Sequence, residues 1–98
     1  MLGTPEKFGY MAGLMKDFLE RVYYVCEGKV EARPYAVFVS AGNDGTGAMN
    51  SIDRIVTGLR LKKIHDGVIV KGEPDEAALA RCEELGATMA AGIAFGAF

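Results

Sequence analysis

The stretch Gly3-Thr4-Pro5-Glu6-Lys7-Phe8-Gly9-Tyr10-Met11-Ala12-Gly13 runs directly into an amphipathic helical segment, Leu14 to Val25. In a parallel α/β domain, a loop that feeds a helix in this way normally follows a strand, at the carboxyl edge of the sheet where ligands bind. Only Met1 and Leu2 precede the loop. We therefore expect the chain to open on a stub of a strand.

The helical segment carries an apolar stripe opposite a charged face. At helical spacing the stripe contains Met11, Leu14, Met15, Phe18, Leu19 and Val22. The other face holds Lys16, Asp17, Glu20 and Arg21. This pattern predicts a helix that buries one side.

Two apolar runs beyond this helix are typical of strands. Tyr35 to Ser40, preceded by Pro34, is apolar at nearly every position, which favours a strand covered on both faces. The glycine-rich loop Ala41 to Gly47 follows, and apolar residues then recur at helical spacing from Met49 to Leu59. Val68 to Val70 is the second apolar run.

A last helix is expected to start at Pro74, after Gly72. Its apolar face would hold Leu79, Cys82, Leu85, Gly86, Met89 and Ile93. The order helix, strand, helix, strand, helix implies parallel strands with right-handed crossovers. The fold class is therefore α/β, in a single domain that spans residues 1 to 98.

Composition narrows the function classes. The chain has 98 residues, half of them apolar, and a formal charge of −2 without a block of like charges. Nucleic acid and anionic membrane surfaces are therefore unsuited as partners. No apolar run approaches the roughly 20 residues of a membrane span, and the N-terminus lacks a signal-peptide layout, so we expect a cytoplasmic protein.

The nucleophilic and metal-ligating residues are few. Cys26 and Cys82 form no CxxC motif and are expected to be buried free thiols. His65, the single histidine, lies in a polar connection and is expected to be a solvated loop residue. We predict no catalytic side chain and no metal site.

The glycine-rich segments have several interpretations. Gly42-Asn43-Asp44-Gly45-Thr46-Gly47 matches neither GxGxxG nor GxxxxGK[ST], and Asp44 would repel a phosphate. Ordinary strand-to-helix turns also favour Gly, Asn and Asp. The four tyrosines could suggest a base-stacking platform, but no basic patch accompanies them, and packing is the better interpretation.

The Gly3-Thr4-Pro5 and Phe8 to Gly13 motifs, with the Lys16 to Arg21 helix, make the chain resemble the flavodoxin-like family. The resemblance is to the NAD(P)H-dependent FMN reductases and the tryptophan-repressor-binding-type quinone reductases. It implies a three-layer parallel sheet and a possible FMN cofactor. By comparison with that family, the chain would be truncated, with a stub of the third strand and without the first two strands and helices.

The resemblance also implies where a flavin would bind. Two loops would embrace the isoalloxazine ring, with the cofactor-binding residues Thr4, Pro5, Lys7, Phe8, Gly9, Tyr10, Ala41, Gly42, Asn43, Gly45 and Gly47. Glycines allow close backbone approach to the ring, and Phe8 or Tyr10 can supply an aromatic neighbour. The family's phosphate-binding loop has no counterpart in these residues, so FMN binding is expected to be weak.

The implied activity is NAD(P)H-linked electron transfer to a flavin or a quinone, with NAD(P)H as a further ligand. Because a flavin carries out the redox chemistry itself, the lack of a catalytic triad is compatible with this activity. A sheet edge left open would be covered by self-association, so we expect a homodimer. The alternatives are a non-catalytic interaction module and a piece of a longer flavoprotein.

Overall fold

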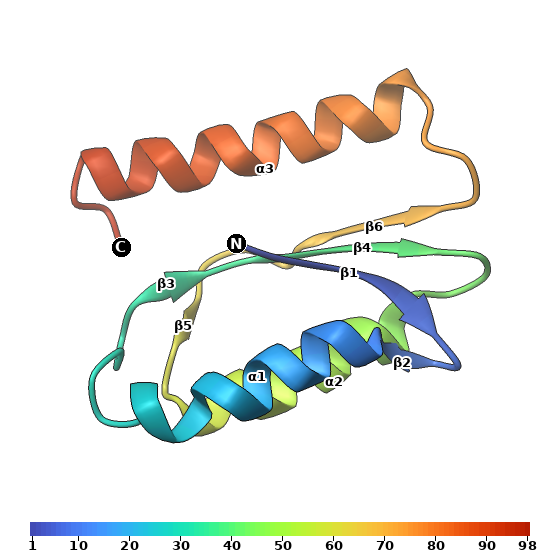
Figure 1. Cartoon of the computed structure of the whole chain (residues 1–98). Helices are drawn as coiled ribbons and strands as arrows, with labels where there is room; N and C mark the ends of the chain where they lie inside the picture. The colour runs from blue at the N-terminus through green and yellow to red at the C-terminus, as the bar shows by residue number, and fades with distance from the viewer.

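The computed structural model describes residues 1–98, and it shows the expected three layers (Figure 1). A sheet with strand order β2-β1-β4-β6 lies between α1 and α2 on one face and α3 on the other. The strands β1 (Leu2–Lys7), β4 (Val37–Ala41) and β6 (Val68–Lys71) are parallel. The short β2 (Tyr10–Met11) pairs antiparallel with β1.

The helices are α1 (Gly13–Cys26), α2 (Thr46–Gly58) and α3 (Glu76–Ala94). A second small sheet joins β3 (Pro34–Tyr35) and β5 (Lys62–Lys63) in parallel. None of the helices has both the length and the apolar composition that a membrane span requires. The predicted α/β class is confirmed, and the main sheet is parallel except at β2.

The first strand differs from its prediction. Instead of a stub at Met1 and Leu2, β1 continues to Lys7, and its register aligns Leu2 with Val37 and Pro5 with Ser40. The expected loop was wrong because a tight turn at Phe8 and Gly9 folds the chain back as a hairpin. Thr4, Pro5 and Lys7 therefore lie on a strand.

The strand predicted from Tyr35 to Ser40 is interrupted in the structure. The run from Tyr35 to Ser40 divides at Ala36, which leaves β3 and β4 in different sheets. Along β4, Val37, Val39 and Ala41 are buried, whereas Phe38 is 40% exposed. Coverage of both faces was therefore wrong for β4, because α3 packs mainly on β6.

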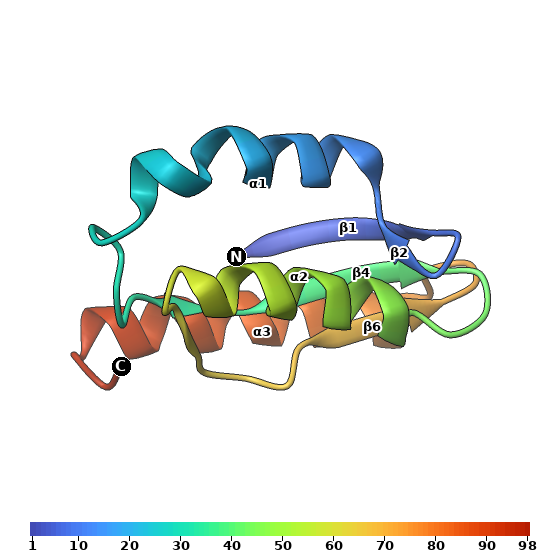
Figure 2. The same ribbon diagram turned by 90° about the horizontal axis from the view of Figure 1, so that it is seen from below.

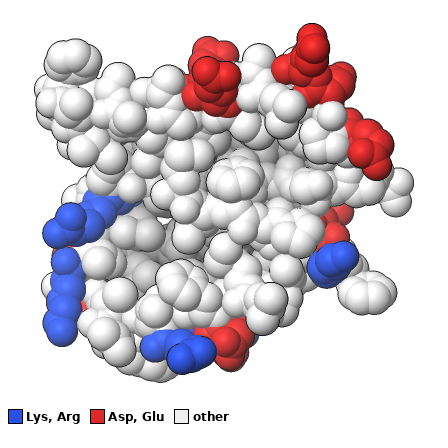
Figure 3. All heavy atoms as spheres, turned by 45° about the horizontal axis from the view of Figure 1, so that its top comes forward, with Lys and Arg blue, Asp and Glu red and all other residues white.

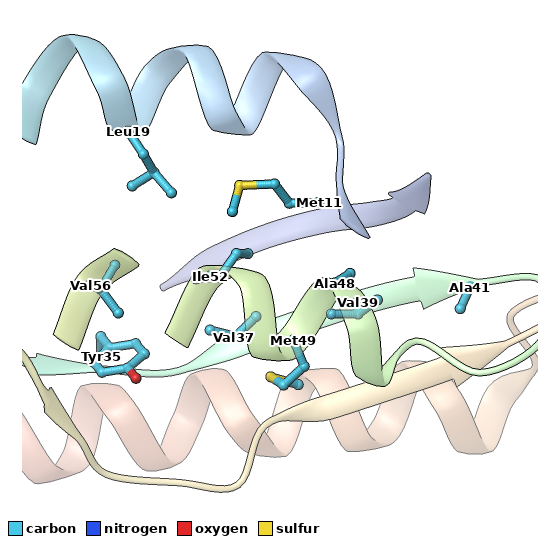
Figure 4. Close-up of a cluster of buried hydrophobic side chains, with 10 residues drawn as sticks. All are labelled: Met11, Leu19, Tyr35, Val37, Val39, Ala41, Ala48, Met49, Ile52 and Val56. Atoms are coloured by element: carbon cyan, nitrogen blue, oxygen red, sulfur yellow. The ribbon is translucent and has the colours of Figure 1, made fainter. Parts of the chain in front are cut away.

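Two buried clusters hold the layers together. The larger lies between the sheet and α2, where Met11 and Leu19 point toward Ile52 and Val56 (Figure 4). The smaller places Leu85 and Met89 of α3 against β6. The expected face of α3 was wrong at Leu79 and Ile93, which are both 60% exposed.

The first helix contributes little to this core. Of its residues only Leu19 is buried, and the predicted stripe was wrong at Leu14 and Phe18, which are 86% and 49% exposed. Figure 2 shows the cause, since α1 lies over the β1 side of the sheet and extends beyond it. The helix therefore has little sheet surface to cover.

Candidate functional site

The two loops predicted to hold a ring do meet at the carboxyl edge of the sheet. A Cβ atom built on Gly47, in the first turn of α2, would lie 2.0 Å from the carbonyl oxygen of Gly9. Such a contact cannot be accommodated by backbone atoms, so residue 47 has to be glycine for the hairpin to rest on α2. The β1–β2 hairpin and the β4–α2 loop thus form one continuous surface.

The hairpin turn presents an aromatic side chain to solvent. Lys7 pairs with Tyr10 across a two-residue turn, in which Phe8 and Gly9 have φ angles of 54° and 71°. Two positive φ angles are the signature of a type I′ turn, which glycine tolerates and phenylalanine adopts only at a cost. The Phe8 side chain is fully exposed and contacts no core.

Thr4 is committed to internal hydrogen bonds. It is 5% exposed, its hydroxyl donates to the Pro5 carbonyl over 2.8 Å, and its oxygen accepts from the Ala12 amide over 2.9 Å. The side chain therefore fastens the hairpin to the start of α1. Of the residues predicted for ring binding, Thr4, Ala41 and Gly45 are buried, and Gly47 is half-buried.

A residue that the sequence analysis missed organises the loop pair. The Glu6 carboxylate accepts hydrogen bonds from the backbone amides of Gly45 (3.0 Å) and Ala48 (3.3 Å). Gly45 stands at the N-cap of α2 and has no side chain for this purpose. The cap thus comes from about 40 residues away in sequence, and no local capping motif could have revealed it.

The outer part of the β4–α2 loop is open. Gly42 and Asn43 are exposed, and their backbone N–H groups donate to no acceptor within the protein. A Cβ at Gly42 would meet nothing within 4 Å. This short segment therefore offers free amide donors and room for close approach.

The same edge of the sheet carries carboxylates at the starts of α2 and α3, beside the exposed Lys7 and Lys71 that end β1 and β6. Asp44 accepts a hydrogen bond from the Thr46 hydroxyl over 2.6 Å, and Asp75 caps α3 by accepting from the Ala78 amide over 2.8 Å. Acidic side chains also gather along α3 in the space-filling view (Figure 3). The N-termini of α2 and α3 are thus both occupied by carboxylates, which disfavours a phosphate there.

A polar network lies on the other side of α2. The Tyr35 hydroxyl donates to Asp53 over 2.8 Å, and the Lys63 ammonium pairs with the same carboxylate over 2.7 Å. Burial raises the pKa of the Tyr35 phenol well above its ordinary value of 10.0, and the hydrogen bond and charge of Asp53 raise it further. These contacts tie β3 and β5 to α2.

The remaining candidate residues do not join the site. Cys26 and Cys82 are free, as predicted, but partly exposed rather than buried. His65 is exposed, and its Nδ1 accepts a hydrogen bond from the Gly67 amide over 2.9 Å. Tyr10 lines a groove between α1 and α2, and Tyr24 is 83% exposed, so packing was the wrong interpretation for Tyr24.

The parallel strands, the helices on both faces and the loops that meet at the carboxyl edge have the arrangement of a flavodoxin-like α/β fold. Comparison with known sequences finds two similar proteins. The chain is 33% identical over 75 residues to an NAD(P)H dehydrogenase (quinone) of Acidithiobacillus ferrooxidans. It is 35% identical over 75 residues to an NAD(P)H dehydrogenase (quinone) of Paracoccus denitrificans.

Each alignment covers 76% of this chain, and 36% and 34% of the respective relatives. The chain thus spans about a third of the length of the curated relatives it matches. No family model matches the chain.

Proposed function

We propose that this chain takes part in NAD(P)H-linked electron transfer to a quinone, and that its carboxyl-edge loops bind the ring of a flavin. The observation that carries the proposal is the contact between the β1–β2 hairpin and the β4–α2 loop, seen at Gly9 and Gly47. The names of the two relatives support the reaction class.

The residues of the loop surface suit a flavin ring. An isoalloxazine has a flat apolar face and an edge of carbonyl and ring-nitrogen acceptors. Gly42 and Asn43 offer uncommitted amide donors to such an edge, and the exposed Phe8 ring offers a flat neighbour. The ring would lie on the outside of the two loops, because their backbones are in contact.

The residues do not suit the phosphate of FMN. A phosphate would be expected at the start of a helix. At α2 the amides of Gly45 and Ala48 already serve the Glu6 carboxylate, and Asp44 adds a second negative charge nearby. The cofactor proposal is therefore restricted to the ring.

In this proposal the flavin and the residues of the chain have different roles. A bound flavin supplies the acceptance of hydride and the transfer of electrons. The chain's own residues position the ring: the Gly42 and Asn43 amides fix its edge, and Glu6 holds α2 and the loop in place. No side chain at this edge is required as a proton donor.

The test compares riboflavin with FMN, using the quenching of flavin fluorescence on addition of the chain. Since the phosphate finds no site, the two ligands are expected to bind with equal affinity. Glu6→Gln removes the negative charge that would compete with a phosphate for the amides at the start of α2. This variant is therefore expected to bind FMN more tightly than riboflavin. Failure of both flavins to bind, or wild-type binding of FMN more than about tenfold tighter than riboflavin, would contradict the proposal.

A second candidate function is an interaction module that pairs with another copy of the chain, and the free edge of β1 favours it. Leu2 donates to the Ala36 carbonyl, so by alternation Gly3 and Pro5 face away from β4. Gly3 presents both backbone groups to solvent, whereas Pro5 has no N–H. Since β2 covers the end of β1 at Lys7, the open edge is short.

Light scattering tests this candidate. A dimer mass that is lost when Gly3 is replaced by proline, with an unchanged circular dichroism spectrum, would support pairing through β1. A monomer at all concentrations would exclude it.

A further inference from the structure

A groove of about 590 Å³ lies between α1 and α2, and it shares only Tyr10 with the loop surface described above. This volume falls within the range of small-molecule sites, roughly 300–1,000 Å³. Half of the lining residues are hydrophobic. The lining residues come from α1, α2 and the short strand β2.

Aromatic side chains dominate one wall. Three of the four tyrosines of the chain line the groove, and the Tyr23 and Tyr24 rings meet edge to face with centroids 5.3 Å apart. A Cβ built on Gly58 would lie 2.2 Å from the Tyr23 hydroxyl. Tyr23 thus reaches across to α2 only because residue 58 is glycine, and it closes this end of the groove.

The floor of the groove leaves no polar group that a ligand would have to pair. Leu19 and Ile55 are apolar, and the Ser51 oxygen is already satisfied. It accepts a hydrogen bond from the Met11 amide over 3.1 Å, and its hydroxyl donates to the Ala48 carbonyl over 2.8 Å. A flat apolar group can therefore cover the floor without leaving a polar atom unpaired.

The rim carries one uncommitted charge. Lys16 pairs with Glu20 over 3.1 Å, so these two charges compensate each other. Arg54 makes no ion pair and no side-chain hydrogen bond in the protein, although it lines the groove. A guanidinium in this position is suited to a carboxylate, to which it can donate two parallel hydrogen bonds.

We propose that the groove between α1 and α2 binds a planar aromatic carboxylate, with its ring against the tyrosine wall and its carboxylate on Arg54. Aromatic walls recognise the flat ring, and the single free cation recognises the anion. This site is independent of the flavin ring and does not rest on the proposed electron transfer.

The experiment is an isothermal titration of the whole chain with 2-naphthoate and, separately, with uncharged 2-naphthalenemethanol. Because 2-naphthoate is small and the site is shallow, we expect the chain to bind it with a Kd of about 1 mM. Arg54→Ala is expected to weaken 2-naphthoate about tenfold and to leave the alcohol unchanged. Arg21→Ala removes the same charge from α1 at a residue outside the groove lining, and it is expected to change neither affinity.

A second variant tests the wall without touching a charge. Gly58→Ala forces the Tyr23 hydroxyl to move, so it is expected to weaken both probes alike. The proposal would be overturned by an absence of saturable 2-naphthoate binding or by an Arg54→Ala variant that binds as wild type. Equal losses in the Arg21→Ala and Arg54→Ala variants would also overturn it, because they would indicate attraction by net charge alone.

Discussion

The helices α1 and α2 lie on the same face of the sheet and have nearly the same length, 14 and 13 residues, yet they are used very differently. Five residues of α2 are buried, against one of α1. Both helices carry apolar side chains at helical spacing. The periodicity therefore tells which side chains share a face, and the position of the helix over the sheet decides whether that face is buried.

The difference extends to the helix starts. The N-terminus of α2 is held by the Glu6 carboxylate and by the hairpin turn, whereas Ala12 at the N-cap of α1 provides no side-chain cap. We infer that α2 anchors the loop surface and that α1 is the more weakly held element. Three predictions test this contrast, and a fourth tests the hydrogen bond between Tyr35 and Asp53 of α2.

Removal of core volume should separate the two helices most strongly. Ile52→Ala in α2 empties a position with no exposure and is expected to lower the free energy of unfolding by about 3–4 kcal/mol. Leu14→Ala in α1, where the side chain is 86% exposed, should cost under about 0.5 kcal/mol. Urea unfolding measures both, and equal losses would refute the contrast.

The glycines in the first turns give a second matched pair. Gly47→Ala brings a Cβ against the Gly9 carbonyl and is expected to cost about 2 kcal/mol, because two backbone segments must separate. Gly13→Ala meets nothing within 4 Å and should stabilise α1 slightly, by about 0.5 kcal/mol. Thermal unfolding of the two variants checks the signs, which are expected to be opposite.

The third prediction concerns the N-terminal caps of α1 and α2. Glu6→Gln weakens the charge-assisted bonds to Gly45 and Ala48 and is expected to cost about 1 kcal/mol. Ala12→Ser should instead add a cap to α1 and contribute about 0.5 kcal/mol. Faster hydrogen exchange at the start of α2 in the Gln variant is the expected signature; unchanged exchange there would rule out the capping role of Glu6.

The smallest effect concerns pH. The folded state raises the pKa of Tyr35, so it holds the phenol proton more tightly than the unfolded chain does. This contribution to stability is complete below the ordinary phenol value of 10.0, and it is lost as the pH rises beyond that value. Tyr35→Phe should flatten the decline in unfolding free energy above about pH 10, and a parallel decline in both proteins would contradict the assignment.

The alternation of strands and helices and the meeting of two loops at the sheet edge could be predicted from the sequence. The hairpin at Phe8 could not, since a phenylalanine with positive φ contradicts local preference and is held by the contact of Gly9 with Gly47. The Glu6 cap was equally hidden, because it joins residues far apart in the chain. The exposure of Leu14 and Phe18 on α1 depends on where the helix lies relative to the sheet, which periodicity does not contain.

The most direct test of the flavin-ring proposal is a riboflavin titration followed by ¹H–¹⁵N correlation spectra of the labelled chain. We predict that the amide signals of Phe8, Gly42 and Asn43 shift together and saturate with one dissociation constant, while those of Arg54 and Tyr23 stay in place. Shifts confined to the groove between α1 and α2, or no saturable shift at Gly42 and Asn43, would contradict the proposal that the carboxyl-edge loops bind the ring.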